Sequence, residues 1–407
     1  MLRKFMLVML CLSLVTVFAL PTFAQDATEE PTTEVTVPAD GTAEPTADVT
    51  VESTAETTAA PGEQPTDVAP TEEPTAETTA EGPGAPPVPE NAILSGLNFP
   101  RGIAYDEAGN LFVAEAGLGG TEVLMESPDP EFPDLTAGLT SQVTMLAADG
   151  TVSVPLKNLF SSGTPDAETG GVAAVASNGT SLWLAIAGGG PVPSPFYTDA
   201  VVEVDMATWR IKTWIDLYGN EVLNNPDGND PLDSNVNDLA VSPDGTLFIM
   251  DTGANTLFTW TADGGLVPFL VWSENPVPTS VAFAENGDVY VGFLGQGLAP
   301  GAGKIEHWSA DGSTLVETFE GLNTITDVAI GADGNVYAVS LVQFGDQGPQ
   351  MGSGSLLMVN TDGATVVAEG LPQPFSLAQA PDGSWSVSVN TVFAPPGAGA
   401  VLTFGGM

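Results

Sequence analysis

Polar and charged residues recur at matching places in six similar segments of the sequence, where they could bind a cation or a small ligand. Each segment contains an Ala five residues before a Gly, and the residues two or three positions before that Ala are often polar. Acidic residues also end two of the apolar stretches that follow the Gly. The set comprises Arg101, Glu115, Asn237, Asp238, Asp251, Thr279 and Asp327. If the six segments fold around one axis, these side chains converge on one face.

Converging oxygen atoms of this kind could hold a hard cation. Calcium takes six to eight oxygen ligands at about 2.3–2.6 Å, and carboxylates and amide carbonyls supply them. The alternative is that the residues are solvated or hydrogen-bonded to one another, with Arg101 neutralising Glu115. Residue types and spacing alone leave both interpretations open.

A second group of oxygen-bearing residues lies in a single loop. Asp227, Asn229, Asp230 and Asp233 follow one another closely, a composition similar to that of calcium-binding loops. The stretch lacks the spacing and the final Glu of an EF-hand. It therefore predicts either a calcium site, with calcium as the one cofactor that the sequence suggests, or a polar surface loop.

Residues for nucleophilic or histidine-based catalysis are scarce. His307 is the only His, and it lies in a segment that we expect to be an outer strand. Cys11 is the only Cys, and the sequence has no Gly-x-Ser-x-Gly elbow and no P-loop. The pattern argues against His-rich zinc sites and His general bases.

The six segments are best explained as β-hairpins. Their shared glycines lie 42 to 70 residues apart, at Gly109, Gly179, Gly245, Gly287, Gly334 and Gly383. Alternating apolar residues flank the glycines, and Gly favours tight hairpin turns because it adopts φ > 0 without strain. A second hairpin follows most of the first ones, for example around Asp263-Gly264 and Asp311-Gly312. Two hairpins form a four-stranded antiparallel unit.

The repeats predict an all-β fold, namely a six-bladed β-propeller of four-stranded antiparallel blades in residues 91–407. The last repeat lacks a fourth strand, whereas residues 92–97 form an additional strand before the first repeat. We expect this N-terminal strand to complete the last blade and close the ring, which removes exposed strand edges.

Two further segments precede the predicted propeller. Residues 1–24 combine Arg3 and Lys4, an apolar run and small residues before a cut after Ala24, as in a cleaved secretory signal peptide. Residues 25–90 are rich in Thr, Glu, Ala and Pro, and they contain no Lys, Arg or aromatic residue. We expect a disordered acidic linker there. The sequence thus predicts a secreted, extracellular or periplasmic protein without a transmembrane segment in the mature chain; an uncleaved anchor and lipidation of Cys11 are the alternatives.

The charge of the chain excludes one class of partner. The 407 residues include 52 Asp and Glu but only 7 Lys and Arg, which gives a formal net charge of −45. Nucleic-acid binding needs Lys and Arg to displace counterions from phosphates. We therefore expect no nucleic-acid partner.

An ordered set of motifs in residues 91–407 resembles the ScyD/ScyE family of secreted or periplasmic propellers, which are similar in style to NHL-repeat proteins. The matching strings are Gly96-Leu97-Asn98-Phe99-Pro100-Arg101-Gly102-Ile103-Ala104, Asn225-Pro226-Asp227-Gly228 and Asp251-Thr252-Gly253-Ala254-Asn255. Val236-Asn237 departs from the family, which tends to have Pro-Tyr there. The resemblance implies a propeller outside the cytoplasm, and it brings no catalytic residues with it.

Two functions fit these observations. The first is a non-enzymatic binding or scaffold module for a small molecule, an envelope component or a protein. Long insertions around 118–142, 160–170 and 188–200 would then offer a binding surface, with Phe160 among their aromatic residues. The alternative is a metal-dependent, calcium-type hydrolase or lactonase at the channel mouth. Some propeller lactonases hold a divalent metal with Glu, Asn and Asp, as Glu115, Asn237 and Asp251 could do.

Overall fold

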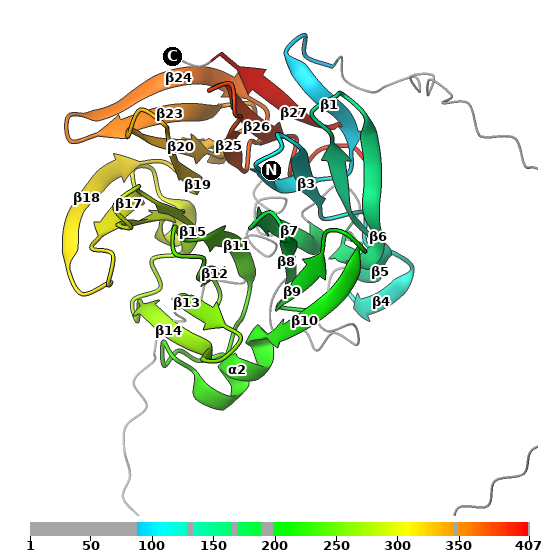
Figure 1. Cartoon of the computed structure of the whole chain (residues 1–407), viewed down its shortest axis with the longest axis horizontal. Helices are drawn as coiled ribbons and strands as arrows, with labels where there is room; N and C mark the ends of the chain where they lie inside the picture. Colours follow the sequence, from blue (N-terminus) through cyan, green and yellow to red (C-terminus); the bar gives the residue numbers. More distant parts are fainter. Residues whose placement is uncertain (1–87, 128–132, 165–168, 189–197, 346–347, 406–407) are drawn as a thin grey trace, which may run out of the picture. The chain divides into compact units, whose positions relative to one another are not determined.

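The computed structural model describes residues 88–127, 133–164, 169–188, 198–345 and 348–405. The predicted signal peptide and the linker up to residue 87 lie outside these ranges, so both stay predictions. The described part consists mainly of antiparallel strands, with the short helix α2 (Leu217–Asn224) and the 3-10 helix η1 (Gln296–Leu298) (Figure 1). No helix of the described part is long and apolar enough to cross a membrane.

Three sheets each contain four strands that follow one another along the sheet. The first contains β11 (Val236–Val241), β12 (Leu247–Asp251), β13 (Thr256–Thr261) and β14 (Gly265–Val271). The second contains β15 (Pro278–Phe283), β16 (Val289–Phe293), β17 (Gly303–Trp308) and β18 (Leu315–Leu322). The third contains β19 (Ile325–Ile330), β20 (Val336–Ser340), β23 (Gly354–Asn360) and β24 (Gly363–Leu371). The hairpin of β21 (Gln343–Gly345) and β22 (Gly348–Gln350) projects between β20 and β23.

The N-terminal strand completes the last sheet, as the sequence predicted. This sheet has the order β1 (Ala92–Leu97), β27 (Gly399–Phe404), β26 (Trp385–Val389) and β25 (Leu377–Gln379). β1 pairs antiparallel with β27, and the register places Leu97 opposite Gly399. The two ends of the domain are therefore joined by main-chain hydrogen bonds.

The prediction of six separate four-stranded blades is wrong for the first two repeats, which form one nine-stranded sheet. Its order is β10 (Arg210–Asp216), β9 (Ala200–Asp205), β8 (Ser181–Ala187), β7 (Thr169–Ser177), β6 (Val152–Gly163), β5 (Leu135–Leu146), β3 (Leu111–Glu115) and β2 (Pro100–Tyr105), and β4 (Glu122–Met125) pairs with β5. Besides this nine-stranded sheet, the hydrogen-bond pattern of the described residues gives four separate sheets of four strands each. The physical reason is length, because β5 and β6 each run for 12 residues and the end of β6 reaches the start of β7.

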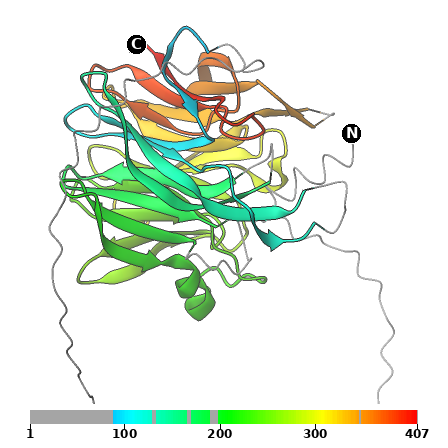
Figure 2. The same cartoon turned by 90° about the vertical axis from the view of Figure 1, so that its right-hand side faces the viewer.

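The first strands of the predicted repeats contact one another in a closed cycle. β2 contacts β7, β7 contacts β11, β11 contacts β15, β15 contacts β19, β19 contacts β25, and β25 contacts β2. Figure 1 shows β7, β11, β15, β19 and β25 as inner elements, with β10, β14, β18 and β24 further out, and Figure 2 shows the same sheets from the side. The described domain is therefore a β-propeller arrangement.

The hairpin turns follow the sequence closely. The six shared glycines all adopt φ between +78° and +88°, a conformation that L side chains rarely take. In the first hairpin the Gly109 N–H donates to the Asp106 carbonyl at 3.0 Å. The predicted turn chemistry is confirmed.

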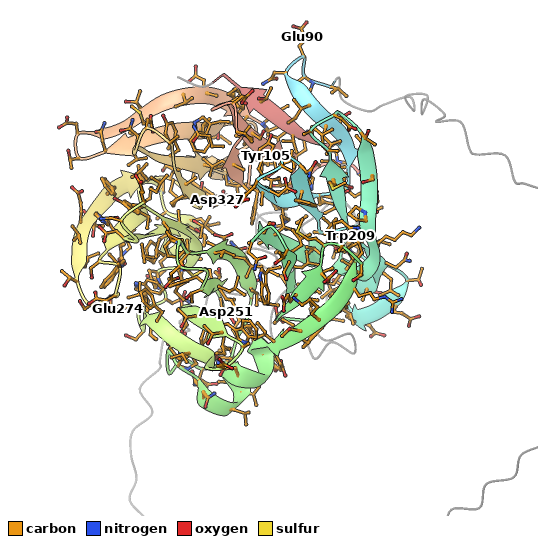
Figure 3. The ribbon with its side chains drawn as sticks, viewed as in Figure 1. Glu90, Tyr105, Trp209, Asp251, Glu274 and Asp327 are labelled. Carbon is orange, nitrogen blue, oxygen red and sulfur yellow. The ribbon has the colours of Figure 1, made fainter. Side chains whose placement is uncertain are left out.

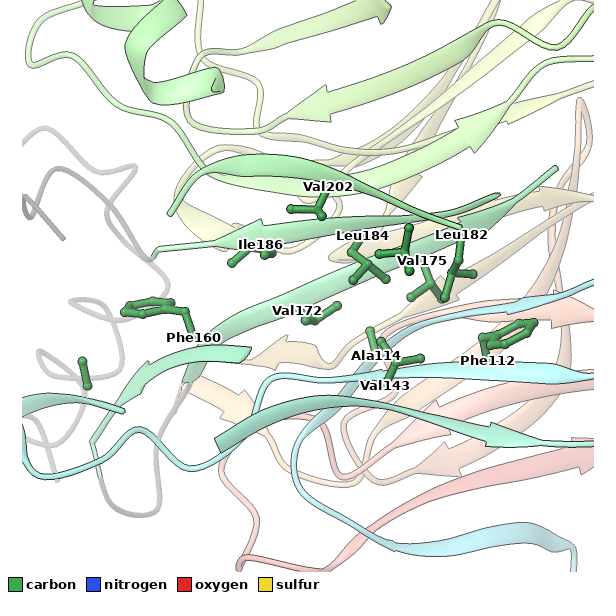
Figure 4. Packing of buried hydrophobic residues seen from close by; sticks show 12 residues of the cluster. Phe112, Ala114, Val143, Phe160, Val172, Val175, Leu182, Leu184, Ile186 and Val202 are labelled. Atoms are coloured by element: carbon green, nitrogen blue, oxygen red, sulfur yellow. The ribbon is translucent and has the colours of Figure 1, made fainter. Parts of the chain in front are cut away.

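Apolar residues between neighbouring sheet faces form the core. Figure 4 shows a cluster between the two repeats of the nine-stranded sheet, in which Phe112 and Val143 of the first repeat pack with Val172, Leu184 and other residues of the second. Burying a large aliphatic or aromatic side chain contributes about 1.5–3 kcal/mol. Phe160 is only 4% exposed in this cluster, so it packs in the core and offers no surface to a partner.

Candidate functional site

The inner strands share a β-bulge at the position where the sequence predicted functional side chains. The pairing shifts between Val236 and Asp238, between Pro278 and Ser280, and between Ile325 and Asp327. A bulge leaves a residue without its regular partner in the ladder, so other groups must satisfy main-chain N–H donors nearby. The bulges explain why polar residues recur there.

Asp238 and Asp327 bridge neighbouring inner strands. Asp238 Oδ2 accepts the Val281 N–H of β15 at 2.8 Å, while Oδ1 accepts the N–H of the residue that follows it at 2.8 Å. Asp327 Oδ2 accepts the Ser376 hydroxyl at 2.6 Å and the Leu377 N–H of β25 at 2.9 Å. Each carboxylate therefore connects one repeat to the next.

These two carboxyls hold protons more strongly than ordinary Asp. Burial raises the pKa of Asp327 to about 7, against the hydrogen bonds that it accepts. Burial also raises the pKa of Asp238 well above its usual range, and the charge of Asp327 adds to the shift. Two buried carboxyls with raised pKa values, one on β11 and one on β19, are candidates for acid–base chemistry.

Asn237 and Thr279 also connect inner strands, as neighbours of this pair. The Asn237 Nδ2 donates to the Thr279 carbonyl at 2.8 Å, and the Thr279 hydroxyl donates to the Ile325 carbonyl at 2.9 Å. β11, β15 and β19 are thus linked by side chain to main chain bonds. The structure brings Asn237, Asp238, Thr279 and Asp327 together on adjacent inner strands.

Arg101 lies on another part of the cycle, on β2. Its guanidinium Cζ is 4.8 Å from the centre of the Phe375 ring, in the segment before β25, and the side chain is buried. A guanidinium over an aromatic face is an attractive cation–π contact. Arg101 therefore contributes to the packing between the first and last repeats.

Glu115 and Asp251 occupy equivalent corners rather than the inner strands. Glu115 Oε2 accepts the Asn98 N–H at 2.7 Å, and its Oε1 accepts from Gln142 and Thr144 at 2.8 and 2.5 Å. Asp251 accepts the Asn235 N–H at 2.8 Å and the Ser234 hydroxyl at 2.6 Å. In both repeats the acid that ends the second strand anchors the chain just before the first strand.

We expect Glu115→Gln to lower the free energy of unfolding by about 1–2 kcal/mol, because the amide nitrogen cannot accept the hydrogen bonds that the carboxylate accepts. Chemical denaturation of both proteins measures the difference. Glu107→Gln is the control, since Glu107 is exposed and should tolerate the change. If the stability is unchanged but ligand binding or substrate turnover is lost, Glu115 has a functional role and not a structural one.

The four loop residues predicted as calcium ligands separate in the structure. Asp227 is buried and uses both oxygens, accepting from the Asn229 N–H at 2.9 Å, the Asn229 Nδ2 at 2.7 Å and the Asn255 Nδ2 at 2.9 Å. Asp230 is exposed. Asp233 lies inward, and its Oδ1 has no hydrogen-bond partner. Of the predicted four, Asp233 is the one with a buried, unpartnered oxygen.

Sequence reasoning missed two carboxyls in this corner, Asp199 and Glu221, which lie beside the predicted Asp233 and Asp251. Burial raises the pKa of Glu221 on α2 to about 8 and that of Asp233 to about 7, and nearby carboxylates add to both shifts. Burial likewise raises the pKa of Asp199 and of Asp251. Asp199 and Glu221 lie in insertions outside the repeated phrase, so the repeat alignment gave no signal for them. Figure 3 labels Asp251 in this region and Asp327 near β19.

The remaining features argue for structural roles. His307 stacks on Tyr290, with ring centres 4.3 Å apart, and its Nε2 lies 2.9 Å from Asp288 Oδ2. Within the described ranges, no three His, Cys, Asp or Glu side chains are grouped so that they could hold a metal ion. The regions that combine buried acids with raised pKa values are therefore the Asp238–Asp327 pair and the corner around Glu221.

No family model matches the chain, and no curated protein matches it in sequence. Several solved structures are similar to it. Virginiamycin B lyase from Staphylococcus aureus is 13% identical with a TM-score of 0.42, over 75% of this chain and 84% of that one. The PQQ-bound aldose sugar dehydrogenase from Streptomyces coelicolor is 14% identical with a TM-score of 0.48, over 77% and 96%. A gluconolactonase from Xanthomonas campestris is 13% identical with a TM-score of 0.48, over 77% and 87%.

Proposed function

We propose that the chain is a ScyD/ScyE-like β-propeller that acts outside the cytoplasm as a binding or scaffold module without enzymatic activity. In this proposal the nine-stranded sheet serves as two blades joined at one edge, so that the propeller has six. The closed cycle of six inner strands supports this count. The short pairing of β6 with β7, at two residue pairs only, also supports it.

The observation that carries the proposal is what Glu115 and Asp251, the two acids that could have held a metal, do in the structure. Glu115 and Asp251 could have held a catalytic metal together with Asn237. Instead, both side chains accept hydrogen bonds that anchor the chain before the inner strands. The Asn237 amide donates to a main-chain carbonyl. Both carboxylate oxygens of Glu115 and of Asp251 already accept hydrogen bonds, so a metal would have to share or displace these donors. These residues make a rigid scaffold, and binding is then expected from the loops that it carries.

The place of action is part of the proposal and rests on the sequence. The signal-like residues 1–24 and the acidic linker would deliver the domain to the outside of the cell or the periplasm and hold it at a distance. Its ligand would be a small molecule, an envelope component or a protein, and not a nucleic acid. The excess of acidic residues supports this last point.

A second candidate function is a hydrolase or lactonase, and the Asp238–Asp327 pair favours it. Two buried carboxyls with raised pKa values could act as acid and base on an ester or lactone. The hydrogen bonds of both side chains to main-chain N–H groups of the next strand weigh against it, because a reacting carboxyl must release or share these donors.

A comparison of hydrolysis rates separates the two candidates. We expect the full-length chain, with calcium added, to hydrolyse gluconolactone and p-nitrophenyl acetate no faster than buffer. Asp238→Asn/Asp327→Asn provides the matched double variant. Turnover above background that disappears in the double variant would establish the hydrolase. A ligand that raises the melting temperature and is recovered unchanged would support the binding module.

A further inference from the structure

Buried oxygen atoms without hydrogen-bond partners concentrate in one corner of the domain. Four buried side-chain oxygen atoms of the described residues in this corner lack a hydrogen-bond partner. They are Glu221 Oε2, Asn225 Oδ1, Asp233 Oδ1 and Asn255 Oδ1. Buried polar groups in folded proteins are nearly always satisfied, so four unpartnered acceptors in one region require an explanation.

The four oxygens come from three segments, namely α2 with its C-cap, the loop before β11 and the turn between β12 and β13. Glu221 belongs to α2, and Asn225 caps its C-terminal end in the left-handed conformation. Asp233 lies in the loop before β11, and its N–H hydrogen-bonds to the Glu221 carboxyl. Asn255 lies in the turn between β12 and β13, where the Thr252 N–H donates to the Asn235 carbonyl. A ligand held by all four would tie α2 to that turn.

The two Asn side chains are oriented with their oxygens away from donors. The Asn255 Nδ2 donates to Asp227 Oδ2 at 2.9 Å and to the Gly253 carbonyl at 3.2 Å. The Asn225 Nδ2 donates to the Asn229 carbonyl at 2.9 Å. Since both nitrogens face acceptors, exchanging O and N would place oxygen against oxygen. The amide oxygens are therefore fixed as acceptors.

Because the acidic side chains in this corner are buried, a negative charge on them strongly favours a bound cation. Glu221 and Asn255 are each only 1% exposed, and Asp251 and Asp199 are 0% and 2% exposed. The charges that act on Glu221 and Asp233 are those of neighbouring carboxyls, from Asp227 and Asp251. A buried carboxylate without a counter-charge costs several kcal/mol. Such a group either keeps its proton or binds a cation.

We propose that these four oxygens bind one calcium ion, which fixes α2 to the turn between β12 and β13. Two carboxylate and two amide oxygens are hard ligands, and calcium accepts an irregular set that waters complete to six or more. Magnesium requires near-ideal octahedral geometry, which oxygens from separate segments of an irregular loop rarely provide. Only two ligands are carboxylates, so the site is compatible with the lack of a group of three acids.

Asp227 has a positioning role in this site. Its carboxylate holds the Asn255 and Asn229 amides, and through Asn255 it aims the amide oxygen at the ion. This differs from the sequence-based hypothesis, in which Asp227, Asn229 and Asp230 were ligands themselves. The inference goes beyond the proposed function and does not depend on it, because binding of the ion needs no other partner.

Calorimetric titration of the full-length chain with calcium chloride, after removal of metals by a chelator, tests the proposal. The salt concentration should be about 0.15 M, which screens diffuse binding to the acidic surface. We expect one calcium per chain and a melting temperature that rises with calcium, because an ion that binds only the folded state stabilises it. Magnesium at the same concentration should give a smaller shift.

Neutral variants of matched shape identify the ligands. Glu221→Gln and Asp233→Asn should each weaken calcium binding by about tenfold or more, since affinity depends on the charge of the ligands. Asp230→Asn is the control, because Asp230 is an exposed acid in the same loop and should leave the affinity unchanged. Both ligand variants should remain folded without calcium, as shown by circular dichroism, because they remove a buried charge.

The proposal is overturned if calcium binds with unchanged affinity to Glu221→Gln and Asp233→Asn. It is also overturned if the wild-type chain takes up no calcium at this salt concentration. A loss of affinity in Asp230→Asn equal to that in the other variants would point to diffuse surface binding and would equally contradict it. None of these results bears on the hydrolysis assay, so the two proposals fail separately.

Discussion

Replacing Gly399 with Val should disrupt the pairing of β1 with β27 that closes the propeller, and it should lower the free energy of unfolding by about 3 kcal/mol. Gly399 begins β27 opposite Leu97 of β1. A Cβ atom there would lie 2.3 Å from Pro100 Cδ and 2.7 Å from the Leu97 carbonyl oxygen. Both neighbours belong to the start of the domain, so the added side chain would force β1 and β2 away from the last sheet.

Chemical denaturation measures this loss, and limited proteolysis locates it. We expect Gly399→Val to be cut in residues 88–100 much faster than the wild type, because a released β1 is an exposed strand. Gly405→Val is the control, since no atom lies within 4 Å of the Cβ position there. If the two variants are equally stable and equally resistant to cleavage, pairing of β1 with β27 does not hold the ring closed.

Asp327→Asn should remove a large part of the pH dependence of stability. Below a pH of about 4 both the folded and the unfolded wild type carry the Asp327 proton. As the pH rises toward 7, the unfolded chain releases this proton while the folded chain keeps it, because burial raises the folded-state pKa to about 7. The wild type thus loses stability relative to Asp327→Asn by about 2–4 kcal/mol in this window, and the difference is constant above it.

Denaturation of both proteins between pH 4.5 and 8 tests the expectation. Asp311→Asn is the matched control, because Asp311 is exposed and hydrogen bonds lower its pKa to about 2. Its difference from the wild type should therefore be flat over this range. If the wild type instead keeps its stability relative to Asp327→Asn as the pH rises, the pKa of Asp327 is not raised. If the wild type gains stability relative to the variant, Asp327 is stabilised as an anion. Either result contradicts the expectation.

Local chemistry along the chain predicted much of the fold. A turn glycine needs only its own neighbours, so Gly245 and four of its counterparts were found from the Asp-Gly and Asn-Gly signals. Gly109, which follows Ala108, was found from the shared spacing and the alternating apolar residues. The closing strand was found because the last repeat lacked a strand and residues 92–97 supplied one. The fusion of the first two repeats was missed, because the length of β5 and β6 lies in an insertion that no repeat pattern describes.

The sequence by itself determined the all-β repeat, its turns, its closure and the residue types gathered on the inner strands. Only the tertiary structure decided what those residues do, because the role of a carboxylate depends on which hydrogen-bond donors the fold places near it. Glu115 accepts hydrogen bonds at both oxygens from the loop before β2 and from the neighbouring strand β5, whereas Glu221 is buried with one oxygen unpartnered. The sequence alone does not distinguish these two Glu residues. Long-range packing sets their hydrogen-bond partners and charged neighbours, and these make one a structural anchor and the other a candidate cation ligand.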